Sequence, residues 1–117
     1  MARIRLTLGA SAAVLALVAA APATSGTKLV ATVGPSFTIT LNQGGKKVTS
    51  LRAGAYTITV HDKSSFHNFS LSGPGAKKST AVSFVGAKTW TVTLGKGMYR
   101  YVCAPHAASM RGSFTVK

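Results

Sequence analysis

The chain has 117 residues, with fourteen Lys and Arg, one acidic side chain and one cysteine, and its formal net charge is +13. This length suits one domain. The single cysteine excludes a disulfide within the chain, and the single carboxylate side chain, Asp62, excludes enzymes that work with a pair of acids, such as glycosidases.

Residues 1–23 have the pattern of a secretory signal peptide. Arg3 and Arg5 precede an apolar, alanine-rich run over residues 6–20, and a small-x-small cleavage pattern follows at residues 21–23. We therefore expect residues 24–117 to form the mature domain, exported to the periplasm, the cell surface or the medium. An uncleaved membrane anchor is the alternative, because the apolar run is close to the roughly 17 residues that a spanning helix needs.

From residue 28 onward, apolar residues alternate with polar ones, which is typical of half-buried strands. We expect, in order, strands over residues 28–33, 36–42, 48–51 and 55–60, a polar loop over 62–65, a strand over 66–71, a basic loop over 72–80, a short strand around 82–84, a strand over 88–94, a tight hairpin turn at 95–97, and strands over 98–102 and 112–116. His67 shares a strand face with Phe69 and Leu71, and Cys103 shares one with Tyr101. Both faces are expected to point into the core.

No stretch of useful length after the signal peptide has the 3.6-residue period of a helix. Seven or eight short strands joined by glycine-containing turns predict an all-β fold, an antiparallel β-sandwich.

The charge of the mature domain is strongly one-sided. Removing Arg3 and Arg5 with the signal peptide leaves twelve basic residues against Asp62, or +11. Such a field favours anionic partners, namely an acidic redox partner protein or an anionic membrane or cell-wall surface. Export, and aromatic residues that occupy strand positions, argue against nucleic acid. A surface charge that only keeps the protein soluble is the alternative.

Cys103, His106 and Met110 lie together on one short segment between two predicted strands. His67, on an inward face of another strand, adds a second imidazole. Two imidazoles and a thiolate, with a weak axial thioether, are the ligands of a type 1 or blue copper centre. The structural alternatives are that Cys103 is a buried small apolar side chain and that Met110 only fills a gap in the core.

A hydrolytic function for the cysteine is less favoured than copper binding. A cysteine hydrolase using Cys103 and His106 would lack an acid to orient the base, because Asp62 is distant in sequence. His61 is out of phase with the buried face of its strand and is expected at the surface.

The segment Phe66-His67-Asn68 and the run Tyr101-x-Cys103-x-Pro105-His106-x-x-x-Met110-x-Gly112 resemble the copper motifs of small cupredoxins, the plastocyanin, amicyanin and pseudoazurin group. The resemblance implies a Greek-key sandwich with one mononuclear copper ion that cycles between Cu(I) and Cu(II). It implies that His67, Cys103 and His106 are equatorial ligands and that Met110 is the axial ligand. It also implies that Asn68 joins the two ligand segments through hydrogen bonds, and that Pro105 supports the ligand loop.

The ligand loop departs from the family in one respect. Three residues separate His106 from Met110, whereas plastocyanin-like loops have four and amicyanin-like loops have two. The length of the Met110 bond is therefore open.

The resemblance implies a monomeric, non-enzymatic one-electron carrier between redox partners. The alternative is a protein that binds copper for delivery or storage without electron transfer.

Overall fold

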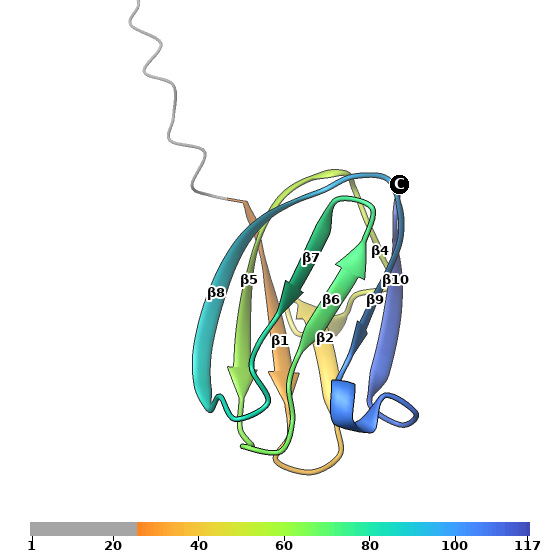
Figure 1. The fold of residues 1–117 in the computed structure, drawn as a ribbon. Helices are drawn as coiled ribbons and strands as arrows, with labels where there is room; N and C mark the ends of the chain where they lie inside the picture. The colour runs from red at the N-terminus through yellow and green to blue at the C-terminus, as the bar shows by residue number, and fades with distance from the viewer. Residues whose placement is uncertain (1–25) are drawn as a thin grey trace, which may run out of the picture.

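Ten β-strands and one short 3-10 helix follow one another in residues 26–117, the part of the chain that this computed structural model describes (Figure 1). The predicted signal peptide over residues 1–23 lies outside the described residues. The elements are β1 (Thr27–Val33), β2 (Ile39–Gln43), β3 (Lys46–Lys47), β4 (Ser50–Leu51), β5 (Gly54–Asp62), β6 (Ser70–Gly73), β7 (Ala76–Ser79), β8 (Gly86–Leu94), β9 (Gly97–Val102), η1 (Ala104–His106) and β10 (Arg111–Val116).

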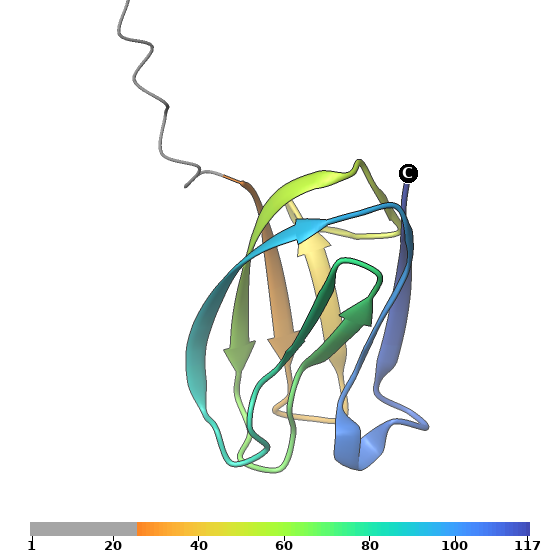
Figure 2. The same cartoon turned by 45° about the horizontal axis from the view of Figure 1, so that its top comes forward.

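The strands form two five-stranded sheets that face each other (Figures 1 and 2). The first sheet has the order β3-β2-β1-β5-β8, and the second has the order β4-β10-β9-β6-β7. The predicted all-β sandwich is confirmed. Within it, β1 pairs with β5 and β4 pairs with β10 in parallel, whereas the other pairs are antiparallel. Alternation of side chains reports which face is buried and carries no information on strand direction, so the prediction of antiparallel pairing throughout missed these two pairs.

The connection at residues 95–97 is not a hairpin. It joins β8 of the first sheet to β9 of the second, so the chain crosses from one layer to the other. Both strands bury alternate side chains in the same core, which is why a hairpin and a crossover look alike in sequence.

Three other segments differ from the sequence prediction. Residues 72–80, predicted as a loop, contain the end of β6 and all of β7, which pair as a hairpin. The short strand expected around Val82 and Phe84 is absent from the described residues, and Val82 is exposed. Phe37, which a strand over residues 36–42 would place on one face with Leu41, precedes β2 and is 65% exposed.

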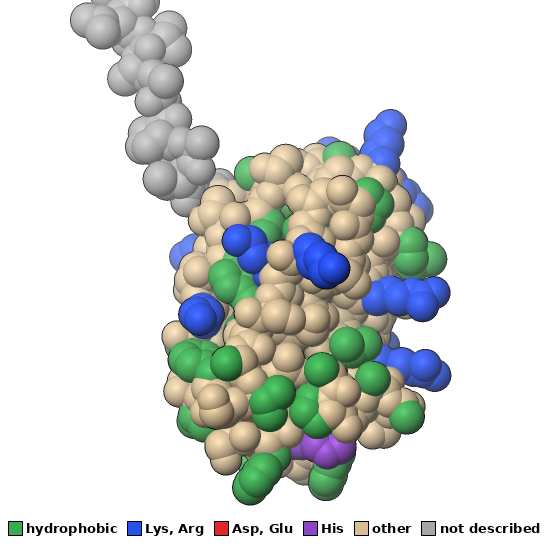
Figure 3. Space-filling model, viewed as in Figure 1, with side chains coloured by type: hydrophobic (Ala, Val, Ile, Leu, Met, Phe, Trp, Pro, Cys, Tyr) green, Lys and Arg blue, Asp and Glu red, His purple; other side chains and the backbone are tan. Residues whose placement is uncertain are grey.

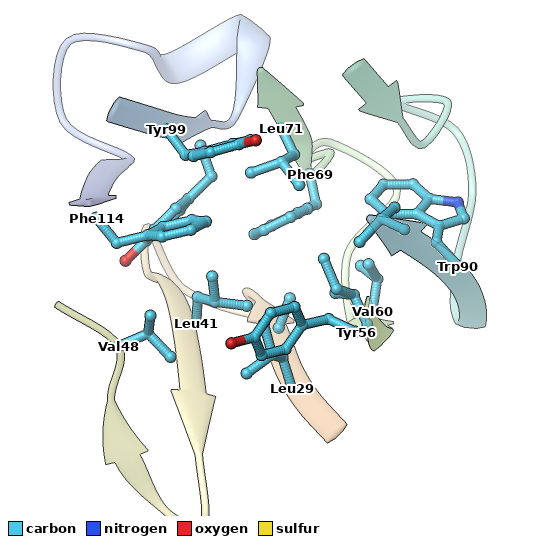
Figure 4. Close-up of a cluster of buried hydrophobic side chains, with 14 of the residues drawn as sticks. Leu29, Leu41, Val48, Tyr56, Val60, Phe69, Leu71, Trp90, Tyr99 and Phe114 are labelled. Atoms are coloured by element: carbon cyan, nitrogen blue, oxygen red, sulfur yellow. The ribbon is translucent and has the colours of Figure 1, made fainter. Parts of the chain in front are cut away.

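The core lies between the sheets and is built from the inward residues of both (Figure 4). Two stacked aromatic pairs cross its centre: Tyr99 with Phe114, at 5.2 Å between ring centroids, and Phe69 with Tyr101, at 5.5 Å. In β8, Trp90 and alternate residues after it are buried while the threonines between them are exposed, as predicted. Three of the four stacked rings belong to β9 and β10 and Phe69 directly precedes β6, so the second sheet supplies the aromatic part of the core.

In residues 26–117, no helix is long and apolar enough to cross a membrane.

Candidate metal centre

The predicted ligands lie at one end of the sandwich, where β9 leads through η1 into β10 (Figures 1 and 2). Cys103 directly follows β9, and His106 is the last residue of η1. His67 comes from the connection between β5 and β6, three residues before β6, which pairs with β9. Their three donor atoms lie within 4.8 Å of one another, so the structure brings together residues that are 36 and 39 positions apart.

The distances between the donor atoms suit a single ion. The Sγ atom of Cys103 lies 3.7 Å from Nδ1 of His67 and 3.6 Å from Nδ1 of His106, and the two Nδ1 atoms are 3.1 Å apart. A metal bound at about 2.0 Å to nitrogen and about 2.3 Å to sulfur can bridge donors up to roughly 4 Å apart. Each residue is represented by the same atom in both of its distances, so a single ion can bind all three donor atoms. A thiolate with two imidazoles is a donor set that copper accepts in both of its common oxidation states.

The ligand loop is closed by its own backbone. The Cys103 N–H donates to the carbonyl of Met110 at 2.9 Å, and the Met110 N–H donates to the carbonyl of His106 at 2.8 Å. The His106 N–H donates to the carbonyl of Cys103 at 3.0 Å, and Pro105 stands at the start of the 3-10 turn, where its fixed φ suits it. These bonds hold the spacing of the loop, and they bring the buried Met110 into the core beside it.

Asn68 connects the segment of His67 to the segment of Cys103. Its Oδ1 accepts a 2.7 Å hydrogen bond from the Ala104 N–H, and its Nδ2 donates to the carbonyl of Thr80 at 3.1 Å. Its backbone N–H points at the Cys103 sulfur, at 3.4 Å. A donor to the sulfur stabilises negative charge there, and the side chain fixes the relative position of the two segments.

The two histidines differ in their access to solvent. His67 is 3% exposed and Cys103 is fully buried, whereas His106 is half-buried. A hollow of about 520 Å³ opens over His106, and its lining is mostly apolar, with Pro35, Phe37, Phe66, Val82 and Pro105 among its residues. Figure 3 shows histidine among hydrophobic side chains at this end of the molecule.

Phe37 contacts both imidazoles edge-on. Its ring centroid lies 5.3 Å from that of His67 and 4.9 Å from that of His106. The alternation over residues 36–42 places Phe37 on one strand face with Leu41 and gives no sign of its position over the two imidazoles. A turn at residues 34–36 displaces it, since the Gly34 N–H bonds to the carbonyl of Thr38 before β2 begins.

Asp62, the only acidic side chain of the chain, is also buried near the site, at 2% exposure. Its Oδ1 accepts a hydrogen bond from the Ser64 N–H at 2.9 Å, and its Oδ2 has no partner. Burial raises the pKa of Asp62, while the Ser64 hydrogen bond and the charge of His67 act in the opposite direction. Asp62 was predicted to lie in a polar loop, whereas it is the last residue of β5. Its burial could have been predicted from alternation, because Tyr56, Ile58, Val60 and Asp62 are alternate inward residues of that strand.

His61 of β5 and Tyr101 of β9 are two further titratable residues on the strands that precede the donors. His61 is exposed on β5, as predicted, and lies outside the donor cluster. Burial raises the pKa of Tyr101, so its hydroxyl remains neutral next to the site.

Comparison with known proteins agrees with this chemistry. Residues 36–117 match the family described as copper binding proteins, plastocyanin/azurin family. Among solved structures, the chain is similar to rusticyanin from Thiobacillus ferrooxidans, with 27% identity, a TM-score of 0.56, and coverage of 80% of this chain and 79% of that one. A structure of reduced rusticyanin gives 24% identity and a TM-score of 0.59 over 80% of this chain and 81% of that one. A Cu(I) structure of an amicyanin mutant, at 17% identity and a TM-score of 0.51, covers 80% of this chain and 85% of that one, and shows a similar fold. No curated protein matches the chain.

Proposed function

The chain belongs to the plastocyanin/azurin family of copper-binding proteins, and we propose that it is an exported, non-enzymatic carrier of single electrons. The observation that supports this most directly is the cluster of His67, Cys103 and His106, whose donor atoms lie within 4.8 Å. We propose these three as the equatorial ligands of copper and Met110 as the axial ligand. Copper, when bound, supplies the Cu(II)/Cu(I) couple.

The protein contributes a rigid and dry environment for that couple. The loop hydrogen bonds and the Asn68 contacts fix the positions of the donors, and we infer that the spacings change little between the two oxidation states. His67 and Cys103 are buried, which keeps water from adding to the site. Half-buried His106, under the apolar hollow, gives a path of contact from the surface to the donors.

Copper delivery or storage is the competing function. Delivery requires donors that an acceptor can reach and exchange, and burial of two of the three donors disfavours it. Electron exchange measured against copper transfer to an apo-acceptor would separate the two functions.

The test of the proposed function is copper loading of the mature domain. We expect an intense visible thiolate-to-copper band and the EPR spectrum of a type 1 centre, both lost in Cys103→Ser. His61→Ala is the matched control, because His61 is exposed and outside the cluster, and it should keep both signals. A colourless copper complex would overturn the proposal.

The proposal of export rests on the signal peptide predicted over residues 1–23. N-terminal sequencing of secreted protein should find Thr24 as the first residue. Protein that keeps residues 1–23 would instead support the membrane anchor.

A further inference from the structure

A basic groove of about 580 Å³ lies beside the metal centre, where the outer face of β9 and β10 meets β3 of the first sheet. Its lining residues are Lys47, Arg100, Val102, Ala107, Arg111, Gly112 and Ser113. Three of these carry a positive charge. The only carboxylate side chain of the chain, Asp62, is buried at the end of β5 in the first sheet, so the chain has no acidic side chain with which to pair them.

The register of β9 and β10 aims Arg100 and Arg111 away from the core. Arg100 of β9 lies opposite Ser113 of β10, and Val102 lies opposite Arg111. The alternate residues of both strands, such as Tyr101 and Phe114, are buried.

The basic face extends across the sheet beyond the groove. Ser72 of β6 lies opposite Arg100, and Lys77 of β7 lies opposite Ser72. Figure 3 shows Lys and Arg side chains along the side of the molecule on which β9 and β10 lie, and hydrophobic side chains at the end that carries the histidine.

The wall of the groove is built from neighbours of the metal donors. Val102 precedes Cys103, Ala107 follows His106, and Arg111 follows Met110. A molecule seated in the groove would therefore lie one residue away from three of the four proposed ligands. One peptide bond joins each of these three residues to its neighbouring ligand.

On the basis of the proposed function, we propose that this groove docks an acidic redox protein and is a port for electrons to and from the site. A concave surface with cations on its walls fits a protruding carboxylate-rich segment of a protein, whereas a flat lipid surface would leave the groove unfilled. Exposed large apolar side chains such as Phe37 and Phe66, which could enter a membrane, belong to the other hollow.

The electron transfer needs no reactant other than the partner and the copper centre. One electron passes between the partner and the copper centre, so the donor is oxidised by one electron and the acceptor is reduced by one. No covalent bond forms or breaks. The groove acts before this step, by raising the rate at which an acidic partner arrives in a productive orientation.

The experiment follows the oxidation of reduced cytochrome b5, a small acidic haem protein, by the copper-loaded domain in a stopped-flow instrument. The groove variant is R100Q/R111Q, and the matched control is K28Q/R52Q, which removes the same charge from exposed positions outside the groove. At about 0.01 M ionic strength, where the Debye length is about 30 Å, the groove variant should be about tenfold slower than wild type, within the range of electrostatic steering. The control should stay within about twofold, since its charges act only through the general field.

Three further measurements complete the test. R100K/R111K, which keeps the charge, should keep most of the rate. At about 1 M salt, where the Debye length falls to about 3 Å, the rates should converge. Equal slowing of the groove variant and the control, or a difference that persists at 1 M salt, would overturn the proposal. So would loss of binding to phosphatidylserine vesicles in R100Q/R111Q with an unchanged cytochrome rate, because the groove would then be a lipid site.

Failure of the groove can be told apart from failure of the proposed function. The visible band, and reduction by uncharged hydroquinone, report the copper site without docking, and both should be the same in all variants. A wild-type protein without the band contradicts the proposed function. A blue wild type whose rate with cytochrome b5 does not depend on the groove contradicts only the docking site.

Discussion

Asn68 is the residue on which the geometry of the candidate site most depends. Its side chain satisfies a backbone donor at Ala104 and a backbone acceptor at Thr80, and both contacts are in buried or partly buried surroundings. A buried polar group that loses its partner costs about 1–3 kcal/mol. The amide therefore does more than position a ligand: it keeps two crossing segments from having unpaired backbone groups.

We predict that Asn68→Ala destabilises the metal-free domain by about 2 kcal/mol, because two backbone groups lose their partner. Urea denaturation would measure this. Asn42→Ala, on half-buried β2, is the matched control and should cost less than about 1 kcal/mol. Equal effects of the two variants would contradict the role assigned to Asn68.

Asp62 is the second residue with a specific consequence, because its carboxyl group is buried with one oxygen unpartnered. Burial raises its pKa above 3.8 in the folded state. The folded protein therefore binds the Asp62 proton more tightly than the unfolded chain does. This contribution to stability is present at low pH and is lost as the pH rises from the unfolded pKa through the folded one.

We predict that Asp62→Asn gains stability relative to wild type as the pH rises from about 4 to 7. Asparagine keeps an oxygen to accept the Ser64 N–H and removes the ionisable group. The measurement is the difference in free energy of unfolding between the two metal-free proteins across this range, in which shared titrations cancel. A difference that is flat, or that moves in favour of wild type with rising pH, would show that burial does not control this carboxyl.

At the scale of elements, the β9–β10 pair is shaped by one glycine. Gly112 lies opposite Tyr101, and a Cβ on Gly112 would overlap the tyrosine ring. The ring occupies the space that a side chain would fill, and it stacks at the same time on Phe69. The glycine thus gives room for an aromatic residue directly behind the ligand loop.

We predict that Gly112→Ala destabilises the domain by about 1–3 kcal/mol, because the Tyr101 ring must move within a packed core. For a domain of this size, each kcal/mol corresponds to a fall in Tm of about 4–8 °C. Gly95→Ala is the control, since no atom lies within 4 Å of the Cβ position there, and its Tm should be nearly unchanged. Thermal unfolding of both variants decides, and an unaffected Gly112→Ala would show that the tyrosine has free space.

Local sequence patterns predicted the inward faces of the strands but not how the strands are connected and paired. Alternation predicted that His67 and Cys103 face inward, and both are buried and lie in one donor cluster with His106. The position of Phe37 depends on a turn whose backbone bonds no periodicity reports. The crossover after β8 and the parallel pairs depend on which distant strand lies alongside, and a local pattern does not carry that information.

At the scale of the whole molecule, the donors belong to two segments that meet only in the folded chain. Copper should therefore bind the folded state and stabilise it by mass action, by about 4 kcal/mol at a thousandfold excess over the dissociation constant.

We predict that copper raises the Tm of the mature domain by more than about 10 °C, because each kcal/mol of added stability raises the Tm by about 4–8 °C in a domain of this size. Removal of the metal by a chelator should reverse the shift. His67→Ala should abolish it and His61→Ala should retain it, because only His67 lies in the cluster. Equal Tm values with and without copper would mean that the three side chains do not act as a metal site.

The parallel pairing of β1 with β5 and of β4 with β10 has a consequence for how the chain folds. These pairs join Thr27 to Tyr56 and Ser50 to Thr115, so each closes a long loop before it gains any contact. Topologies dominated by such non-local pairs fold on the scale of milliseconds to seconds. β10 also begins at the far end of the ligand loop, and we expect the donors to converge when its pairing is complete. Refolding in the presence of copper should then show the recovery of core fluorescence and the appearance of colour as one kinetic phase.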